Sequence, residues 1–137
     1  MMFGRVMPQA VDLEEAVLGA AMLDKGAFSI IVEKLRPESF YLDAHVEIFN
    51  VMMSLFGNSK PIDILTVHEE LRKNGKIKEI GGVNYLMDLT NKVASAANIE
   101  YHAQIIIQKY IQRALIEVST LTIKDAYSDT KLSLIHI

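Results

Sequence analysis

Few residues of this sequence have the types and spacing that chemistry requires. The only Gly-Lys pair, Gly75-Lys76, is followed by Ile77. A phosphate-binding loop of the form G-x-x-x-x-G-K-[ST] needs a hydroxyl at that position for magnesium and an earlier glycine at fixed spacing, and both are missing. We therefore expect a plain loop at Gly75-Lys76, and a turn at Gly81-Gly82, because no strand is predicted before it.

The ionisable residues likewise show no metal or catalytic pattern. His68-Glu69 begins like the zinc-protease motif H-E-x-x-H, but Arg72 stands where the second histidine belongs. Glu14-Glu15 is an acidic pair on a predicted helix, where adjacent side chains point about 100° apart, so we expect a solvated helix face. Since the chain has no cysteine, thiolate catalysis and cysteine-ligated metals are excluded.

The composition is that of one globular domain. The chain has 137 residues, half of them hydrophobic, and a formal net charge of -3. No cluster of Lys and Arg is present, which argues against strong direct binding to DNA. No apolar run approaches the ~20 residues that span a bilayer, and the start lacks a secretion-signal pattern, so we expect a cytoplasmic protein without membrane contact.

The elements that must position any functional residue are predicted to be helices. Apolar residues recur at spacings of three and four along the chain. Asp12 and Asp63 are candidate helix caps, and Leu65 and Leu71 are expected to face the core. The predicted fold is all-α, with about five short helices in a globular bundle and one long helix, at 12–22, 27–35, 43–56, 61–74, 82–89 and 97–127.

The long helix is the most informative element. About 30 residues give a rod of roughly 45 Å, longer than the ~30 Å width of a small domain, so part of it must project. At 100° per residue, one face forms a predicted core stripe and the opposite face a second apolar line. The core stripe holds Ala103, Tyr110, Ala114 and Leu121, flanked by Ile106 and Ile107; the second line holds Ile105, Ile116 and Ile123, with Gln108 and Gln112 beside it.

Several strings, in order, resemble the N-terminal domain of DnaB-type bacterial replicative DNA helicases over residues 8–127. They include Glu14-Glu15-Ala16-Val17-Leu18-Gly19, Phe40-Tyr41, Pro61-Ile62-Asp63, Ser95-Ala96-Ala97-Asn98-Ile99-Glu100-Tyr101 and Arg113. The resemblance implies a helical head followed by a hairpin of two long helices. Hairpins pair between subunits to form a collar on a hexameric ring, and the collar docks DnaG-type primase.

The resemblance also implies what lies elsewhere. ATP and magnesium belong to a separate C-terminal motor domain, so we expect no catalysis, cofactor or metal within this chain. Expected partners are further copies of the chain, primase and a helicase loader, with DNA bound weakly or not at all. The alternative is a generic helical adaptor or dimerisation module not tied to primase.

The candidate contact residues are chosen from the second apolar line of the long helix and from the strings that carry the resemblance. They are Tyr85, Tyr101, Ile105, Gln108, Gln112, Ile116 and Ile123. Isolated surface isoleucines and a core tyrosine at position 85 are the alternative interpretations. Residues 128–137 are expected to be a turn and a tail, either foreign to the native protein or cut short of the hairpin's second arm. A long helix without that arm leaves an apolar stripe uncovered, which predicts self-association.

Overall fold

The computed structural model describes residues 6–92 and 98–128, and these residues are helical or irregular with no strand. The all-α prediction is therefore confirmed. The elements, in chain order, are α1 (Val11–Leu23), α2 (Ala27–Lys34), the 3-10 turn η1 (Pro37–Ser39), α3 (Asp43–Gly57), α4 (Ile64–Lys73), α5 (Ile77–Ile80), α6 (Gly82–Asn91) and α7 (Ile99–Ala126).

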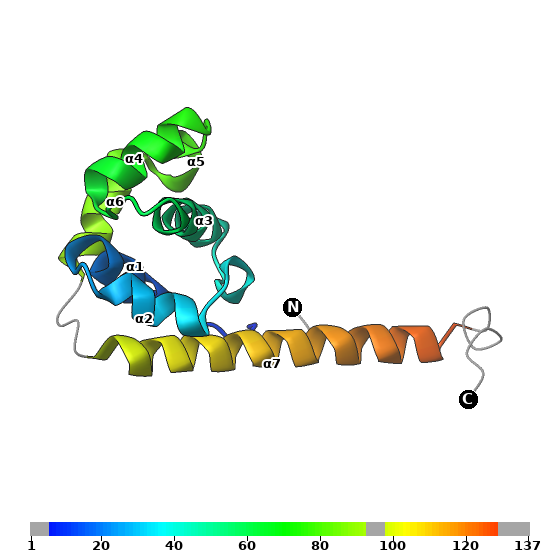
Figure 1. Cartoon of the computed structure of the whole chain (residues 1–137). Helices are drawn as coiled ribbons and strands as arrows, with labels where there is room; N and C mark the ends of the chain where they lie inside the picture. Colours follow the sequence, from blue (N-terminus) through cyan, green and yellow to red (C-terminus); the bar gives the residue numbers. More distant parts are fainter. Residues whose placement is uncertain (1–5, 93–97, 129–137) are drawn as a thin grey trace.

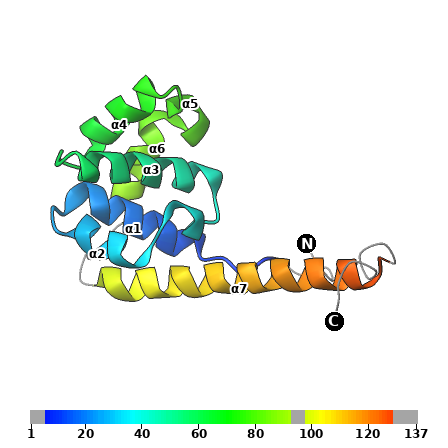
Figure 2. The same ribbon diagram turned by 45° about the vertical axis from the view of Figure 1, so that its right-hand side comes forward.

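The helices form a head and a rod. Helices α1 to α6 make up the head, which sits on the first half of α7, while the second half of α7 extends past it (Figure 1). The same arrangement is visible after a 45° turn (Figure 2). Helix α7 contacts α1, α2 and η1. Its 28 residues correspond to a rod of roughly 42 Å, so the predicted projection is confirmed.

The core includes residues of every helix of the head, and its part between α1, α2 and α3 is rich in aromatic rings. The Phe28 and Phe49 ring centroids are 5.3 Å apart, and Phe40 lies 4.9 Å from Phe49. Tilted rings at these separations are the favourable aromatic geometry. Ile48 and Phe49 of α3 and Leu18 of α1 are fully buried. This core holds α1 and α2 as the platform on which α7 rests.

Local sequence signals explain where several helices begin and end. The Asp63 carboxylate accepts a hydrogen bond from the Thr66 backbone N–H at 2.9 Å, and the Thr66 hydroxyl meets the Asp63 N–H, so the predicted cap of α4 is confirmed. The cap predicted at Asp12 is wrong. Helix α1 begins at Val11, whose N–H donates to the Gln9 side chain. Asp12 lies instead in the first turn, where its charge still favours the helix dipole.

Other local predictions have mixed outcomes. Leu71 is fully buried as expected, but Leu65 is 78% exposed, because Val67 and Leu71 occupy the inner face of α4. The turn at Gly81-Gly82 is confirmed: Gly81 has a φ of 108° and ends α5, and an added Cβ would lie 3.1 Å from the Tyr85 Cβ. Neither α5 nor η1 was predicted, since elements of three or four residues show no periodicity.

Candidate interaction surfaces on the long helix

One face of α7 packs against the head through its first half. Ile99, Ala103 and Ile106 are at most 3% exposed, and Ile107 packs against them from the side. The predicted core stripe is confirmed for Ala103, Ile106 and Ile107. Tyr110 and Ala114, further along, are only partly buried. The contact with the head thus extends along about half of the length of α7.

Arg113 clamps the middle of α7 to the head. Its Nη1 donates to the Pro8 carbonyl at 2.9 Å, and its Nη2 donates to the Ser39 carbonyl at 3.0 Å. The guanidinium also lies between the rings of Tyr41 and Tyr110, at 5.3 and 5.9 Å from their centroids. One side chain therefore joins α7, η1 and the segment before α1. In the sequence, Arg113 was visible only as one of the residues that carry the family resemblance.

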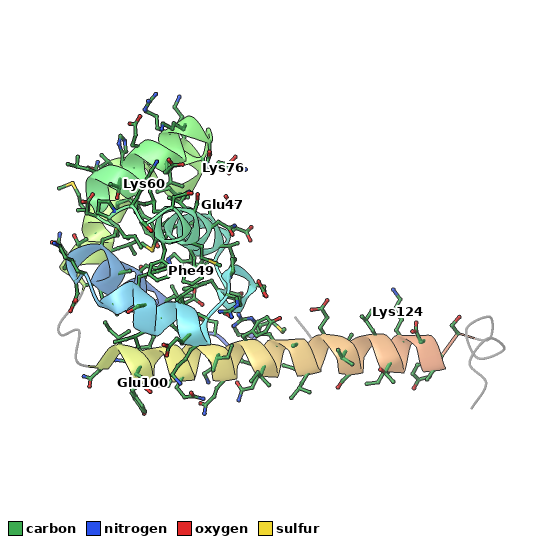
Figure 3. All side chains as sticks on the ribbon, viewed as in Figure 1. Glu47, Phe49, Lys60, Lys76, Glu100 and Lys124 are labelled. Carbon is green, nitrogen blue, oxygen red and sulfur yellow. The ribbon has the colours of Figure 1, made fainter. Side chains whose placement is uncertain are left out.

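From Ile111 onward, an apolar face of α7 is open to solvent. The exposed fractions are 49% for Ile111, 61% for Leu115, 62% for Val118 and 52% for Leu121. We call these four residues the distal stripe. Their spacings of four and three residues place them on one side of the helix. Side chains of this half of α7, including the labelled Lys124, extend into open space (Figure 3).

The exposure of the distal stripe shows that the prediction of Leu121 as a core residue is wrong. Leu121 was placed in the core stripe, but it is 52% exposed, because the second half of α7 extends past the head. The signal was present in the sequence. Ile107, Ile111, Ala114, Val118 and Leu121 alternate spacings of four and three, the heptad pattern of a helix that packs lengthwise on another helix. An exposed apolar stripe of this kind marks a contact surface.

The predicted contact residues on α7 lie on a separate face. Ile105 and Ile116 are partly buried and Ile123 is 48% exposed. Their line is about 140° around the helix from the distal stripe, at 100° per residue. Gln108 and Gln112 are exposed. Helix α7 therefore presents two apolar lines besides its head-side face.

The other two predicted contact residues are tyrosines in different surroundings. Tyr101 lies in the first turn of α7 and is 67% exposed, so its ring is available to a partner. Tyr85 lies on α6 and is part of a side-chain network inside the head. The structure brings Tyr101 and the α7 residues onto one helix, while Tyr85 belongs to a different site.

That network joins α1, α3 and α6 through two buried polar side chains and one partly buried tyrosine. The Tyr85 hydroxyl lies 2.5 Å from His45 Nε2, and His45 Nδ1 lies 2.7 Å from Glu14 Oε1. Glu14 Oε2 accepts the Tyr41 backbone N–H at 2.8 Å. His45 is fully buried and Glu14 is 1% exposed. We call Glu14, His45 and Tyr85 the buried triad.

The phenol of Tyr85 keeps its proton over the ordinary pH range. Burial, followed by the negative charges of Glu15, Glu14 and Asp88, raises its pKa to about 12. A protonated Tyr85 donates to His45 Nε2, which leaves the Nδ1–H of His45 to donate to Glu14. Every member is then satisfied, so the triad fixes three helices relative to one another.

The buried triad overturns the interpretation of Glu14-Glu15 as a solvated face. Glu14 and Glu15 are 1% and 8% exposed, and Glu15 binds Lys92 Nζ with both carboxylate oxygens at 3.1 and 3.0 Å. The two carboxylates point in different directions as expected, but Glu14 pairs with His45 and Glu15 pairs with Lys92. Glu14 precedes Val17 and Leu18 by three and four residues and so shares their side of α1, and this spacing is the signal that the sequence offered.

The described part of the chain offers no metal site. Within residues 6–92 and 98–128, no three side chains of His, Asp or Glu are grouped so that they could hold an ion. Among those same residues, no helix combines the length and apolar character needed to cross a bilayer.

Known proteins with similar sequences share one family. Residues 6–108 match the family model of the DnaB-like helicase N-terminal domain. The replicative DNA helicase DnaB of Rhodothermus marinus is 49% identical over 90% of this chain, which covers 13% of that protein. The replicative DNA helicase DnaC of Bacillus subtilis is 41% identical over 90% of this chain, which covers 27% of that protein. The chain thus spans about a quarter or less of these relatives.

Solved structures agree with this relation. The crystal structure of the N-terminal domain of DnaB helicase from Mycobacterium tuberculosis has a TM-score of 0.87 and 37% identity, and it covers 89% of this chain and 87% of that one. A structure of a DnaB-like replicative helicase and its interactions with primase has a TM-score of 0.70 and 25% identity, covering 82% of this chain and 26% of that one. The chain belongs to the DnaB-like helicase N-terminal domain family.

Proposed function

We propose that this chain is the protein-interaction domain of a replicative DNA helicase, which scaffolds a hexameric ring and docks primase during DNA replication in the cytoplasm. The single observation that carries the proposal is the distal stripe: four large apolar side chains, about half exposed or more, on a helix that projects from the head. The free energy of such a domain falls when another chain covers the stripe and removes its apolar surface from water.

The distal stripe is proposed as the subunit contact. Burying a Leu, Ile or Val side chain completely stabilises by about 1.5–3 kcal/mol, and half of that remains available for side chains that are half exposed. Four such residues offer roughly 3–6 kcal/mol per helix before the cost of association. Pairing of two helices along their length would use the heptad spacing of Ile107 to Leu121.

Primase is proposed to contact α7 on its other exposed side. The DnaB-like replicative helicase whose structure is described with its interactions with primase supports a role of this kind, since it has the same fold at 25% identity. Tyr101, Ile105 and Ile116 offer one aromatic and two aliphatic contacts, with polar Gln108 and Gln112 beside them and Ile123 further along. A few large apolar side chains with a polar rim are typical of protein interfaces. Tyr85 would act indirectly, by holding α6 in place.

The remaining activities are proposed to lie outside this chain. Because the chain spans only 13–27% of the relatives named above, we propose that ATP and magnesium are bound by the rest of the full-length helicase. A helicase loader remains a proposed partner. DNA binding through this domain is proposed to be weak or absent, given the net charge of -3.

The test is a calorimetric titration of the chain with the C-terminal domain of a primase from a DnaB-containing bacterium. We expect saturable binding that Ile116→Glu weakens at least tenfold with an unchanged circular dichroism spectrum. Asn50→Glu introduces the same charge at an exposed site on α3 and should bind like the wild type. Equal affinities of the Ile116 variant and the wild type would contradict the proposed contact.

The same titration separates the alternative function. A generic helical adaptor or dimerisation module would self-associate through the distal stripe without binding primase. Self-association together with no detectable heat from primase would favour that alternative, because the stripe would then serve pairing alone.

A further inference from the structure

A groove on the head lies apart from the long helix. It has a volume of about 710 Å³ and lies where the end of α1, the start of α2, the end of α3 and the segment before α4 meet. In Figure 2 the turn after α3 lies above the turn joining α1 to α2, on the left of the head. None of the lining residues belongs to α7. We call it the head groove.

The head groove has an apolar floor and an exposed apolar rim. Phe28 and Met22 form the floor and are 2% and 5% exposed. Phe56 and Leu23 on the rim are 45% and 61% exposed. The Phe56 ring lies 5.2 Å from the Phe28 ring, which itself packs on Phe49 of the core. The rim aromatic is therefore held in place before any partner arrives.

The head groove also carries two lysines without partners. Lys25 and Lys60 line it, and neither forms an ion pair with another described residue. The one acidic lining residue, Asp63, has its carboxylate bonded to the Thr66 N–H. The groove thus offers positive charge next to apolar surface.

We propose that the head groove is a second docking site, which binds an acidic amphipathic helical segment of a partner protein. Apolar side chains at spacings of three and four would enter between Phe28 and Phe56, the usual mode of a helix in a groove. Its carboxylates would meet Lys25 and Lys60 at the rim. This site is independent of the contacts proposed for α7.

The test uses an unbiased library of displayed 16-residue peptides, selected on the full 137-residue chain. We expect the enriched peptides to combine Asp or Glu with apolar residues at i, i+3 or i+4, and i+7. Synthetic versions should lose at least about tenfold in affinity on Leu23→Ala/Phe56→Ala, as expected for a hot spot. Heteronuclear NMR shifts on wild-type protein should map to the groove residues.

Charge-reversal variants test the proposed contacts between the lysines and an acidic peptide more specifically. Lys25→Glu/Lys60→Glu should weaken the acidic peptides several-fold, mostly at low salt, because exposed ion pairs are screened. Replacing the peptide's acidic residues with lysine should restore its binding to that variant. Lys78→Glu/Lys124→Glu makes the same charge change outside the groove and should leave affinity unchanged. All four sites are exposed, so the fold should survive.

Three results would overturn the proposal. The first is a set of enriched peptides that are neutral or basic, or acidic peptides that bind Lys25→Glu/Lys60→Glu as tightly as they bind the wild type. The second is a selection that yields no peptide sensitive to Leu23→Ala/Phe56→Ala. The third is a drop in the self-associated mass of the chain with those same substitutions, which would show that a second copy occupies the groove. The first two results depend on neither primase nor the distal stripe.

Discussion

The buried triad predicts a large loss of stability on Glu14→Ala. Glu14 accepts two hydrogen bonds in the head, from His45 Nδ1 at 2.7 Å and from the Tyr41 N–H at 2.8 Å. Alanine removes both acceptors and leaves the His45 ring nitrogen and the Tyr41 amide without partners. Because His45 is fully buried, water cannot replace the lost acceptor there without opening the head.

The magnitude follows from these two contacts. A hydrogen bond to a charged group contributes about 1.5–3 kcal/mol, and Glu14→Ala breaks two of them. We expect the free energy of unfolding to fall by roughly 3–5 kcal/mol, a large part of the 5–15 kcal/mol typical of a domain. Glu14→Gln keeps one carbonyl acceptor and should lose about half as much.

Urea denaturation followed by circular dichroism at 222 nm measures the effect. Glu33→Ala on α2 is the matched control, since Glu33 is exposed and has no ion pair among the described residues, and its change should stay within about 0.5 kcal/mol. A loss below about 1 kcal/mol for Glu14→Ala would refute the reasoning, because the carboxylate would then not be holding α1 to α3.

Three further predictions concern the head and its junction with α7. Burial holds the pKa of Tyr85 at about 12, above the unfolded value of 10, so the stability that the triad contributes is intact below pH 10 and is lost as the pH rises towards 12. In a pH titration followed by phenolate absorbance at 295 nm, Tyr85→Phe should remove the ionisation step at the highest pH. Arg113→Met should cost about 2–3 kcal/mol and speed hydrogen exchange in the first half of α7, whereas unchanged exchange would show that the clamp is dispensable. Asp63→Ala should lower the thermal midpoint by removing an α4 cap worth about 0.5–2 kcal/mol, and Asp63→Asn should retain most of it.

Much of the fold could be predicted because its helices are long and periodic. The bounds of α3 and the start of α4 agree with the expected ones to within a few residues, and the Asp63 cap was visible as a residue type at a boundary. The three-residue η1 and four-residue α5 could not be found this way. Their positions are set by packing on α3, which a local pattern does not encode.

The candidate site was harder to predict, for a physical reason. The periodicity of α7 shows which residues share a face but not where the head ends along the helix. Leu121 therefore looked like core and proved 52% exposed. The partner of a buried charge is equally invisible: Glu14 and His45 are 31 positions apart, and only the fold brings them together. Long-range polar pairs need the three-dimensional structure.

The central claim is that the distal stripe of α7 exists to be covered by another chain. Sedimentation velocity of the 137-residue chain between about 1 and 100 μM tests it most directly. We expect wild-type protein to shift to dimers or larger species with concentration, and Leu115→Glu/Val118→Glu to sediment as a monomer with unchanged helicity. Thr120→Glu, on the opposite side of the same helix, should behave like the wild type. A wild-type chain that stays monomeric over this range would contradict the account.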